Sequence, residues 1–188
     1  MTKSTPTLAS RLGTVLIAAS LLFFLILYGP FLLLFLPGKT VAVPQNQPGL
    51  TITIPKINAQ APIIKDVDPW NEAEYRTRLK EGVAHAKGSS LPGEGSTTYL
   101  FAHSSDLPWN LTRYNTAFFR LGELQPGDAI MVTDDVQTFT YQVTAIKVVR
   151  PDEVKYLTQF QDKDQLILQT CTPIGTALKR LLVFAAPA

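Results

Sequence analysis

The stretch QLILQTCTPIGTALKRLLVF, residues 165–184, decides the fold that the sequence predicts. Its two ends, residues 165–170 and 180–184, are short runs rich in Leu, Ile and Val, and such runs are typical of buried strands. The segment between Cys171 and Arg180 contains a proline and a glycine, which mark a loop. We therefore expect two strands, with Cys171 closing the first and Arg180 opening the second. If the strands are neighbours, the two side chains project toward one pocket.

Similar short runs recur between residue 50 and this stretch. They are residues 50–54, 61–64, 97–102, 129–133 and 138–149. Turn residues separate most of them, so we expect a mainly β domain of seven to eight strands. Periodicity alone does not choose between a sandwich and a closed barrel, although closure would remove exposed strand edges.

Short helices are predicted at two places in this domain. Residues 71–81 begin with Asn71 as a cap, have Glu74 three residues later and end at Gly82, which together indicate a helix. Residues 118–124 fit a second, shorter helix before a Pro-Gly turn.

The N-terminal segment differs sharply in composition from this domain. Between Arg11 and Lys39 lie 27 residues without a charge, whereas a helix needs roughly 20 to cross a bilayer. A buried soluble helix rarely has so long an apolar run, and the apolar core of a cleaved signal peptide is usually about 7–15 residues. We therefore predict an uncleaved transmembrane signal anchor over residues 12–36, followed by a linker at 37–49.

Charge patterning indicates the orientation and excludes one class of partner. Lys3 and Arg11 precede the span, so the positive-inside bias predicts cytoplasmic residues 1–11 and an extracytoplasmic domain at 50–188, in a single-pass protein of the cell membrane. From residue 40 onward, 14 Lys and Arg face 15 Asp and Glu. The domain therefore has no basic stripe for nucleic acid.

Three strand ends carry the candidate chemistry. Cys171 is the only cysteine, so an internal disulfide is excluded, and His103 directly follows the predicted strand at 97–102. A thiolate is a strong nucleophile, an imidazole can protonate a leaving amine, and the Arg180 guanidinium can stabilise an oxyanion. Taken alone, a single Cys is more often a small buried hydrophobic residue. A His at a strand end is commonly a structural residue, and an Arg that opens a strand is usually a surface charge.

The order and spacing of these residues resemble a known family. Thr170-Cys171, eight residues and then Arg180 are very similar to the signature of sortases, the membrane-anchored cysteine transpeptidases of the cell wall. The resemblance covers roughly residues 50–186. It includes YLFAHSS at 99–105, similar to the strand with the family's catalytic histidine, and GVAHAKGSSLPGEG at 82–95, similar to a glycine-rich connection.

The resemblance implies a fold and a set of roles. It implies an eight-stranded sortase β-barrel, with Cys171 as the nucleophile, His103 as the general acid and base, and Arg180 holding the substrate carbonyl or oxyanion. Thr170 matches the residue before the nucleophile and is given a supporting role in substrate binding. His85 falls in a different segment of the family, so packing or a loop hydrogen bond is its expected role.

The resemblance also implies substrates and partners. An LPxTG-like sorting signal near the C-terminus of a protein would be cleaved between Thr and Gly, and an amine in the cell wall or in a pilin, or water, would resolve the thioester. Neither a catalytic metal nor a cofactor is expected, while a structural calcium in a loop stays open. Two other functions also remain open: a membrane-tethered binding β-barrel without catalysis and an L,D-transpeptidase-like cell-wall enzyme.

Overall fold

The computed structural model describes residues 8–33, 49–104, 117–159 and 162–188. By its internal contacts the chain divides into two compact units, Met1–Pro37 and Gly38–Ala188. The first contains one long helix, and the second contains the strands.

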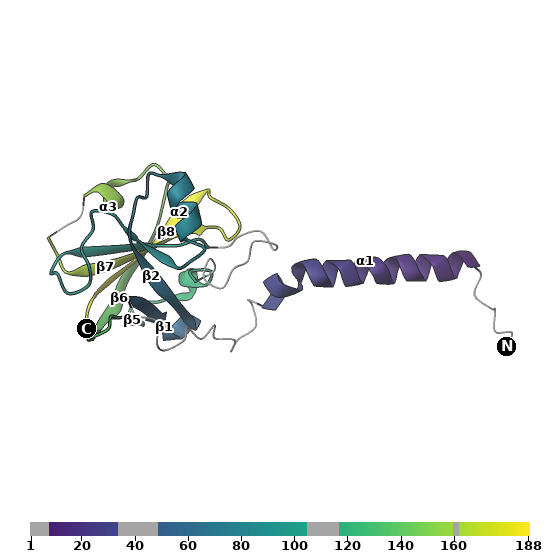
Figure 1. The fold of residues 1–188 in the computed structure, drawn as a ribbon, viewed down its shortest axis with the longest axis horizontal. Helices are drawn as coiled ribbons and strands as arrows, with labels where there is room; N and C mark the ends of the chain where they lie inside the picture. Colours follow the sequence, from purple (N-terminus) through teal and green to yellow (C-terminus); the bar gives the residue numbers. More distant parts are fainter. Residues whose placement is uncertain (1–7, 34–48, 105–116, 160–161) are drawn as a thin grey trace. The chain divides into compact units, whose positions relative to one another are not determined.

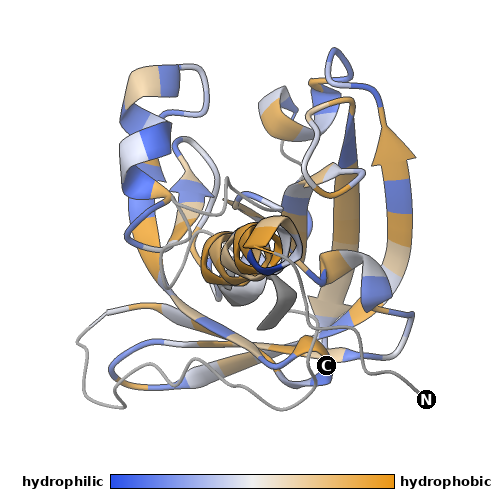
Figure 2. Ribbon diagram, turned by 90° about the vertical axis from the view of Figure 1, so that its right-hand side faces the viewer, coloured by the Kyte–Doolittle hydropathy of each residue, from blue (hydrophilic) through white to orange (hydrophobic). Residues whose placement is uncertain are grey.

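The helix α1, Leu8–Leu33, is built almost entirely from apolar residues. Its segment Leu8–Gly29 is long and apolar enough to cross a membrane, judged by length and composition. Figure 2, which looks down the axis of this helix, shows its visible turns mostly in the hydrophobic colour. Large side chains such as Phe23, which is 67% exposed, have no protein core to cover them. A helix of this kind is stable in hydrocarbon, because its backbone groups bond within the helix.

Eight strands form the second unit. They are β1 (Thr51–Ile54), β2 (Ala59–Val67), β3 (Val83–Ala86), β4 (Thr97–Phe101), β5 (Ala129–Thr133), β6 (Thr138–Val149), β7 (Gln165–Thr172) and β8 (Lys179–Pro187). They close into a barrel in the order β1-β2-β3-β4-β7-β8-β6-β5. The pairs β2–β3 and β4–β7 are parallel, and the other pairs are antiparallel. The predicted mainly β fold is confirmed, and it is a barrel and not a sandwich.

The interior of the barrel is filled by every second residue of its strands. In β7 the inward positions are Leu166, Leu168 and Thr170, each 3% exposed or less. They meet Val183 and Ala185 of β8, which are equally buried. Burying one such leucine stabilises the fold by about 1.5–3 kcal/mol. The other set of positions in β7, which ends at Cys171, consequently lies on the outside of the barrel.

Short helices connect the strands. They are α2 (Glu72–Arg78), α3 (Lys155–Thr158) and the 3-10 helices η1 (Pro55–Ile57) and η3 (Leu121–Glu123). Asn71 caps α2, since its side chain accepts a hydrogen bond from the backbone N–H of Glu74 at 3.2 Å. Figure 1 shows α2, α3 and the β7–β8 loop at one end of the barrel, and the C-terminus at the other.

The structure corrects several predicted boundaries. The predicted strands at 61–64 and 180–184 are parts of the longer β2 and β8, and the predicted helix at 118–124 is a turn followed by η3. The segment 82–95, expected as a connection, contains β3. All four residues of β3 are buried, so it has no alternating polar pattern to reveal it.

Candidate active site

The arrangement of β7 and β8 brings Cys171 and Arg180 together. The two strands are antiparallel, and Cys171 pairs directly with Arg180. Residues directly opposite in such a pair have side chains on the same face, with Cβ atoms about 4.5–5.5 Å apart. Both side chains are partly exposed. The predicted neighbourhood of these two residues is therefore found, with each strand one residue longer at this end than predicted.

The strand β4 brings His103 to the other side of Cys171. β4 runs parallel to β7 with Phe101 paired to Gln169, and the backbone N–H of Ala102 donates to the carbonyl of Gln169 at 3.1 Å. Continuing this register by two residues brings His103 level with Cys171, one strand spacing away, which is about 4.8 Å. Cys171 thus lies between the end of β4 and the start of β8.

Thr170 supports this arrangement from the opposite face of the sheet. Its side chain is 3% exposed and points into the barrel. Its hydroxyl donates a hydrogen bond of 3.0 Å to the backbone carbonyl of Ala102. The bond joins β7, immediately before Cys171, to β4, immediately before His103. We propose that the supporting role of Thr170 is to hold these two residues in register and not to contact substrate.

Arg180 has its guanidinium near the loop that joins β7 to β8. Its Nη1 donates to the carbonyls of Ala177 at 3.1 Å and Lys179 at 3.4 Å. Among the described residues, no carboxylate forms an ion pair with it. A guanidinium without a carboxylate partner keeps its charge and several N–H donors for an oxygen anion.

Two further polar side chains share the face of Cys171. Tyr99 of β4 is 1% exposed, and its hydroxyl donates to Oε1 of Gln169 at 2.7 Å. Burial raises the pKa of Tyr99 well above its ordinary value, and the nearby charge of Arg180 offsets part of this rise. Tyr99 is therefore neutral at physiological pH and acts as a hydrogen-bond donor beside Arg180.

Sequence reasoning did not select Tyr99 or Gln169, although a signal for them exists. Tyr99 lies four residues before His103, and Gln169 lies two residues before Cys171. Side chains two apart in a strand share a face, so the spacing alone places both on the face of the site.

His85 lies outside this arrangement. It is 1% exposed, and its partner in the β3–β4 pair is Leu100, which points to the face opposite Cys171. Nδ1 accepts from the backbone N–H of Asp66 at 3.3 Å, and Nε2 lies 2.9 Å from Oγ of Ser89. With Nδ1 accepting, the proton of a neutral ring is on Nε2. Both nitrogens have local partners, as expected for a histidine with a structural role.

No metal site is apparent in the part of the chain that the structure describes. Within it, no three His, Cys, Asp or Glu side chains lie close enough together to hold an ion.

Comparison with known proteins places the strand domain in one family. The sortase domain family model matches residues 52–188. Sortase D of Bacillus subtilis (strain 168) is 33% identical over 136 residues, which cover 71% of this chain and 60% of that protein. Sortase C-1 from Actinomyces oris has a similar structure, with a TM-score of 0.62 and 33% identity, covering 77% of this chain and 76% of that one.

A further structural match was solved together with a peptide motif. It is sortase C from Clostridium perfringens with the C-terminal cell wall sorting motif, which has a TM-score of 0.58 and is 33% identical. The match covers 73% of this chain and 69% of that one. The matched part of this chain corresponds to 50–60% of the length of the curated relatives.

Proposed function

The chain belongs to the sortase family, and we propose that it is a cysteine transpeptidase whose nucleophile is Cys171. One observation carries the proposal. Cys171 lies on β7 between Arg180, its direct partner on β8, and the end of β4, where the strand register delivers His103. The proposal thus assigns acyl transfer to two residues of adjacent strands, Cys171 and Arg180, and to His103, which follows the strand on the other side of β7.

The proposed reaction has two halves. In the first, the thiolate of Cys171 attacks a peptide carbonyl, the carbonyl electrons move to oxygen, and Arg180 stabilises that oxyanion. When the intermediate collapses, the C–N bond breaks and His103 gives a proton to the departing amine. In the second half, an incoming amine attacks the thioester, loses a proton to His103 and releases the thiolate of Cys171.

We propose that the acyl donor is a protein with an LPxTG-like sorting signal, cleaved between Thr and Gly. The sorting motif bound to the related Clostridium perfringens sortase C supports this class of substrate. The acceptor proposed for the second half-reaction is an amine of the cell wall or of a pilin, with water as the alternative. The result is a surface protein joined covalently to its acceptor.

The direct test is transfer of a peptide to an added amine. The full-length chain in detergent is incubated with a Leu-Pro-Ala-Thr-Gly peptide and triglycine, and products are separated by mass. We expect a peptide cut after Thr and joined to triglycine through a new amide bond. A product cut elsewhere, or no product over a broad set of sorting-signal peptides, contradicts the proposal.

Replacement of Arg180 tests the oxyanion role. Arg180→Ala should lower kcat/KM about 10²–10³-fold, the usual loss for one oxyanion donor. Arg180→Lys should restore part of this loss, because an ammonium supplies charge without the planar set of donors. Steady-state cleavage of the same peptide measures both variants. Equal rates for the alanine variant and the unmodified chain would remove Arg180 from the mechanism.

We also propose that the barrel is outside the cytoplasm and that α1 anchors it. The part of α1 after Arg11 has no charge, and the basic residues Lys3 and Arg11 precede the expected span, which supports this orientation. Protease added to intact cells or spheroplasts should then digest the barrel and leave a short membrane-protected fragment containing α1. Protection of the barrel until the membrane is broken would reverse the orientation.

A further inference from the structure

A pocket of about 290 Å³ opens on the outside of the barrel between β6, β8, β7 and α3. Its floor includes Ile167 of β7, Phe184 of β8 and Thr97 of β4. Ile167 pairs with Tyr99 and with Phe184 in the strand ladders and occupies the same face of β7 as Cys171. The pocket and the candidate nucleophile therefore share one face of the sheet.

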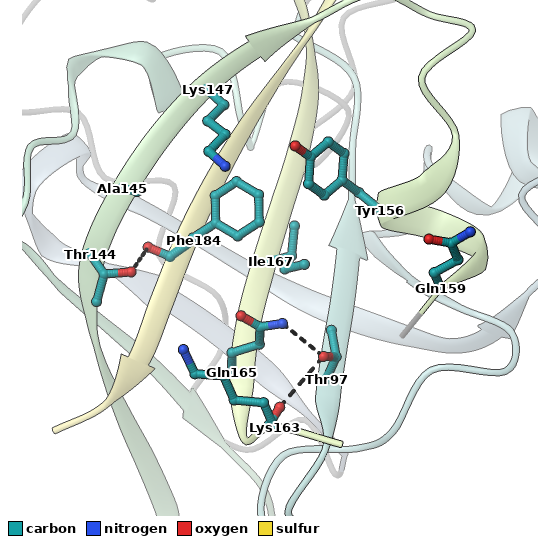
Figure 3. Close-up of a pocket in the computed structure, with 10 residues that line it drawn as sticks. All are labelled: Thr97, Thr144, Ala145, Lys147, Tyr156, Gln159, Lys163, Gln165, Ile167 and Phe184. Atoms are coloured by element: carbon teal, nitrogen blue, oxygen red, sulfur yellow. Dashed lines mark hydrogen bonds between the residues drawn. The ribbon is translucent and has the colours of Figure 1, made fainter. Parts of the chain in front are cut away.

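Two lysines give this pocket a positive charge. Lys147 from β6 and Lys163 from the segment before β7 both line it, and none of its ten lining residues is an acid. Nζ of Lys147 lies 5.2 Å from the ring centre of Phe184 and 5.8 Å from that of Tyr156. Such cation–π contacts hold the ammonium over the apolar wall and leave its N–H donors available. Figure 3 shows the ammonium of Lys147 directly above the ring of Phe184, with the ring of Tyr156 to its right.

Two acids of the neighbouring β6–β7 connection, Asp152 and Glu153, have Arg150 as their partner. The Arg150 side chain binds Asp152 at 3.2 Å, and its backbone N–H donates to Glu153 at 3.1 Å. Burial raises the pKa of Tyr141 in the barrel interior, and the nearby charge of Asp164, whose Oδ1 is itself buried, adds to this rise. Within the described residues, neither Lys147 nor Lys163 has an ion-pair partner.

The distance between Cys171 and the pocket indicates which residues of a bound substrate lie over the pocket. Ile167 and Gln165 precede Cys171 by four and six residues on one strand, and at about 3.3 Å per residue they lie roughly 13 and 20 Å from it. An extended peptide covers the same length per residue. We count substrate residues from the one acylated on Cys171, which is the first, toward the N-terminus of the peptide. In an extended peptide, the fifth to seventh residues then lie over the pocket.

We propose that the pocket is a subsite for acidic residues of the acyl donor, at the three positions immediately before a four-residue sorting motif such as Leu-Pro-x-Thr. This inference rests on the proposed function, because it places the scissile carbonyl at Cys171. We assign the pocket to the part of the donor before the cleaved bond, because that part stays on the enzyme as the thioester and the part after the bond leaves. One subsite can therefore act in both half-reactions. Carboxylates there meet Lys147 and Lys163, while the peptide packs on Phe184 and Tyr156.

Peptide binding to the full-length Cys171→Ala chain in detergent tests the subsite without turnover. Three labelled probes share Leu-Pro-Ala-Thr-Gly: one has three Asp before the motif, one has three Ser there, and one has three Asp after it. Fluorescence anisotropy in 50 mM salt should show the first binding about 3- to 10-fold tighter than the second, with the preference falling in 0.5 M salt because exposed pairs are weak and screened.

Substitutions then assign the effect to the pocket. Adding Lys147→Gln and Lys163→Gln should reduce the preference to less than about twofold, whereas the matched control Lys65→Gln, an exposed lysine on β2, should keep it. Three results overturn the proposal. The first is equal affinity for the first two probes, which includes the case that neither binds. The second is a preference only for Asp after the motif, and the third is a preference that remains after the double substitution.

The proposed function is judged by a separate reaction. The unmodified chain is incubated with the neutral probe, and acylation is measured by intact mass. Acylation without an acidic preference in the binding experiment overturns the subsite alone. The opposite outcome has two parts: the unmodified chain acylates no probe, and the preference for acidic peptides disappears when the two lysines are replaced. This outcome overturns the proposed catalysis and supports the subsite.

Discussion

The Cys171→Ala variant is expected to lose both cleavage and transfer of a sorting-signal peptide completely. The sequence contains no other cysteine, so no second thiol is available to form the thioester. Cys171 is partly exposed and lies at the end of β7, so alanine removes no core packing and the fold should persist. Product formation by mass spectrometry measures activity, and the thermal midpoint checks the fold.

The same variant separates an enzyme from a binding protein. A tethered binding barrel would have no covalent step to lose, whereas a transpeptidase keeps peptide binding and loses all product. Residual turnover within tenfold of the unmodified chain would show that the thiol is not the nucleophile.

Replacement of His103 is expected to give the second-largest loss. His103→Ala should slow thioester formation about 10²–10⁴-fold, the usual range for a positioned acid or base, because the amine then leaves without its proton. Pre-steady-state release of the amine fragment measures this step directly. Peptide binding should change little, since the imidazole is assigned to proton transfer.

His85 provides the matched control for this experiment. His85→Gln disturbs the bonds to Asp66 and Ser89, so we expect a loss of stability of about 1–3 kcal/mol. The folded fraction should acylate at close to the unmodified rate. If His85→Gln stops thioester formation while His103→Ala leaves it intact, the assignment of the histidine is wrong.

Much of the fold is predictable from the sequence, because most of its strands are marked locally. β5 and β6 are found at the residues that alternation and turns predict. In contrast, β3 is four buried residues with no alternation, and α3 has only four residues, too few for a helical period. Both elements take their conformation from packing on the barrel, which a local pattern does not record.

The candidate site also has one part that the sequence predicts and one part that it does not. The pairing of Cys171 with Arg180 follows from two adjacent strands and a short loop, so the sequence was sufficient to predict it. The bond from Thr170 to Ala102 joins residues 68 apart, and the pocket at Lys147 joins five elements. Such features depend on strand order in the barrel, in particular on the parallel β4–β7 pair, which periodicity does not determine.

The measurement that tests the central claim most directly is the intact mass of the full-length chain after brief incubation with a sorting-signal peptide and acid quenching. We predict an added mass equal to the peptide up to its Thr, located on Cys171 by fragmentation and removed by hydroxylamine, as a thioester requires. An unmodified mass while peptide is being cleaved, or an adduct located on any other residue, would contradict the account.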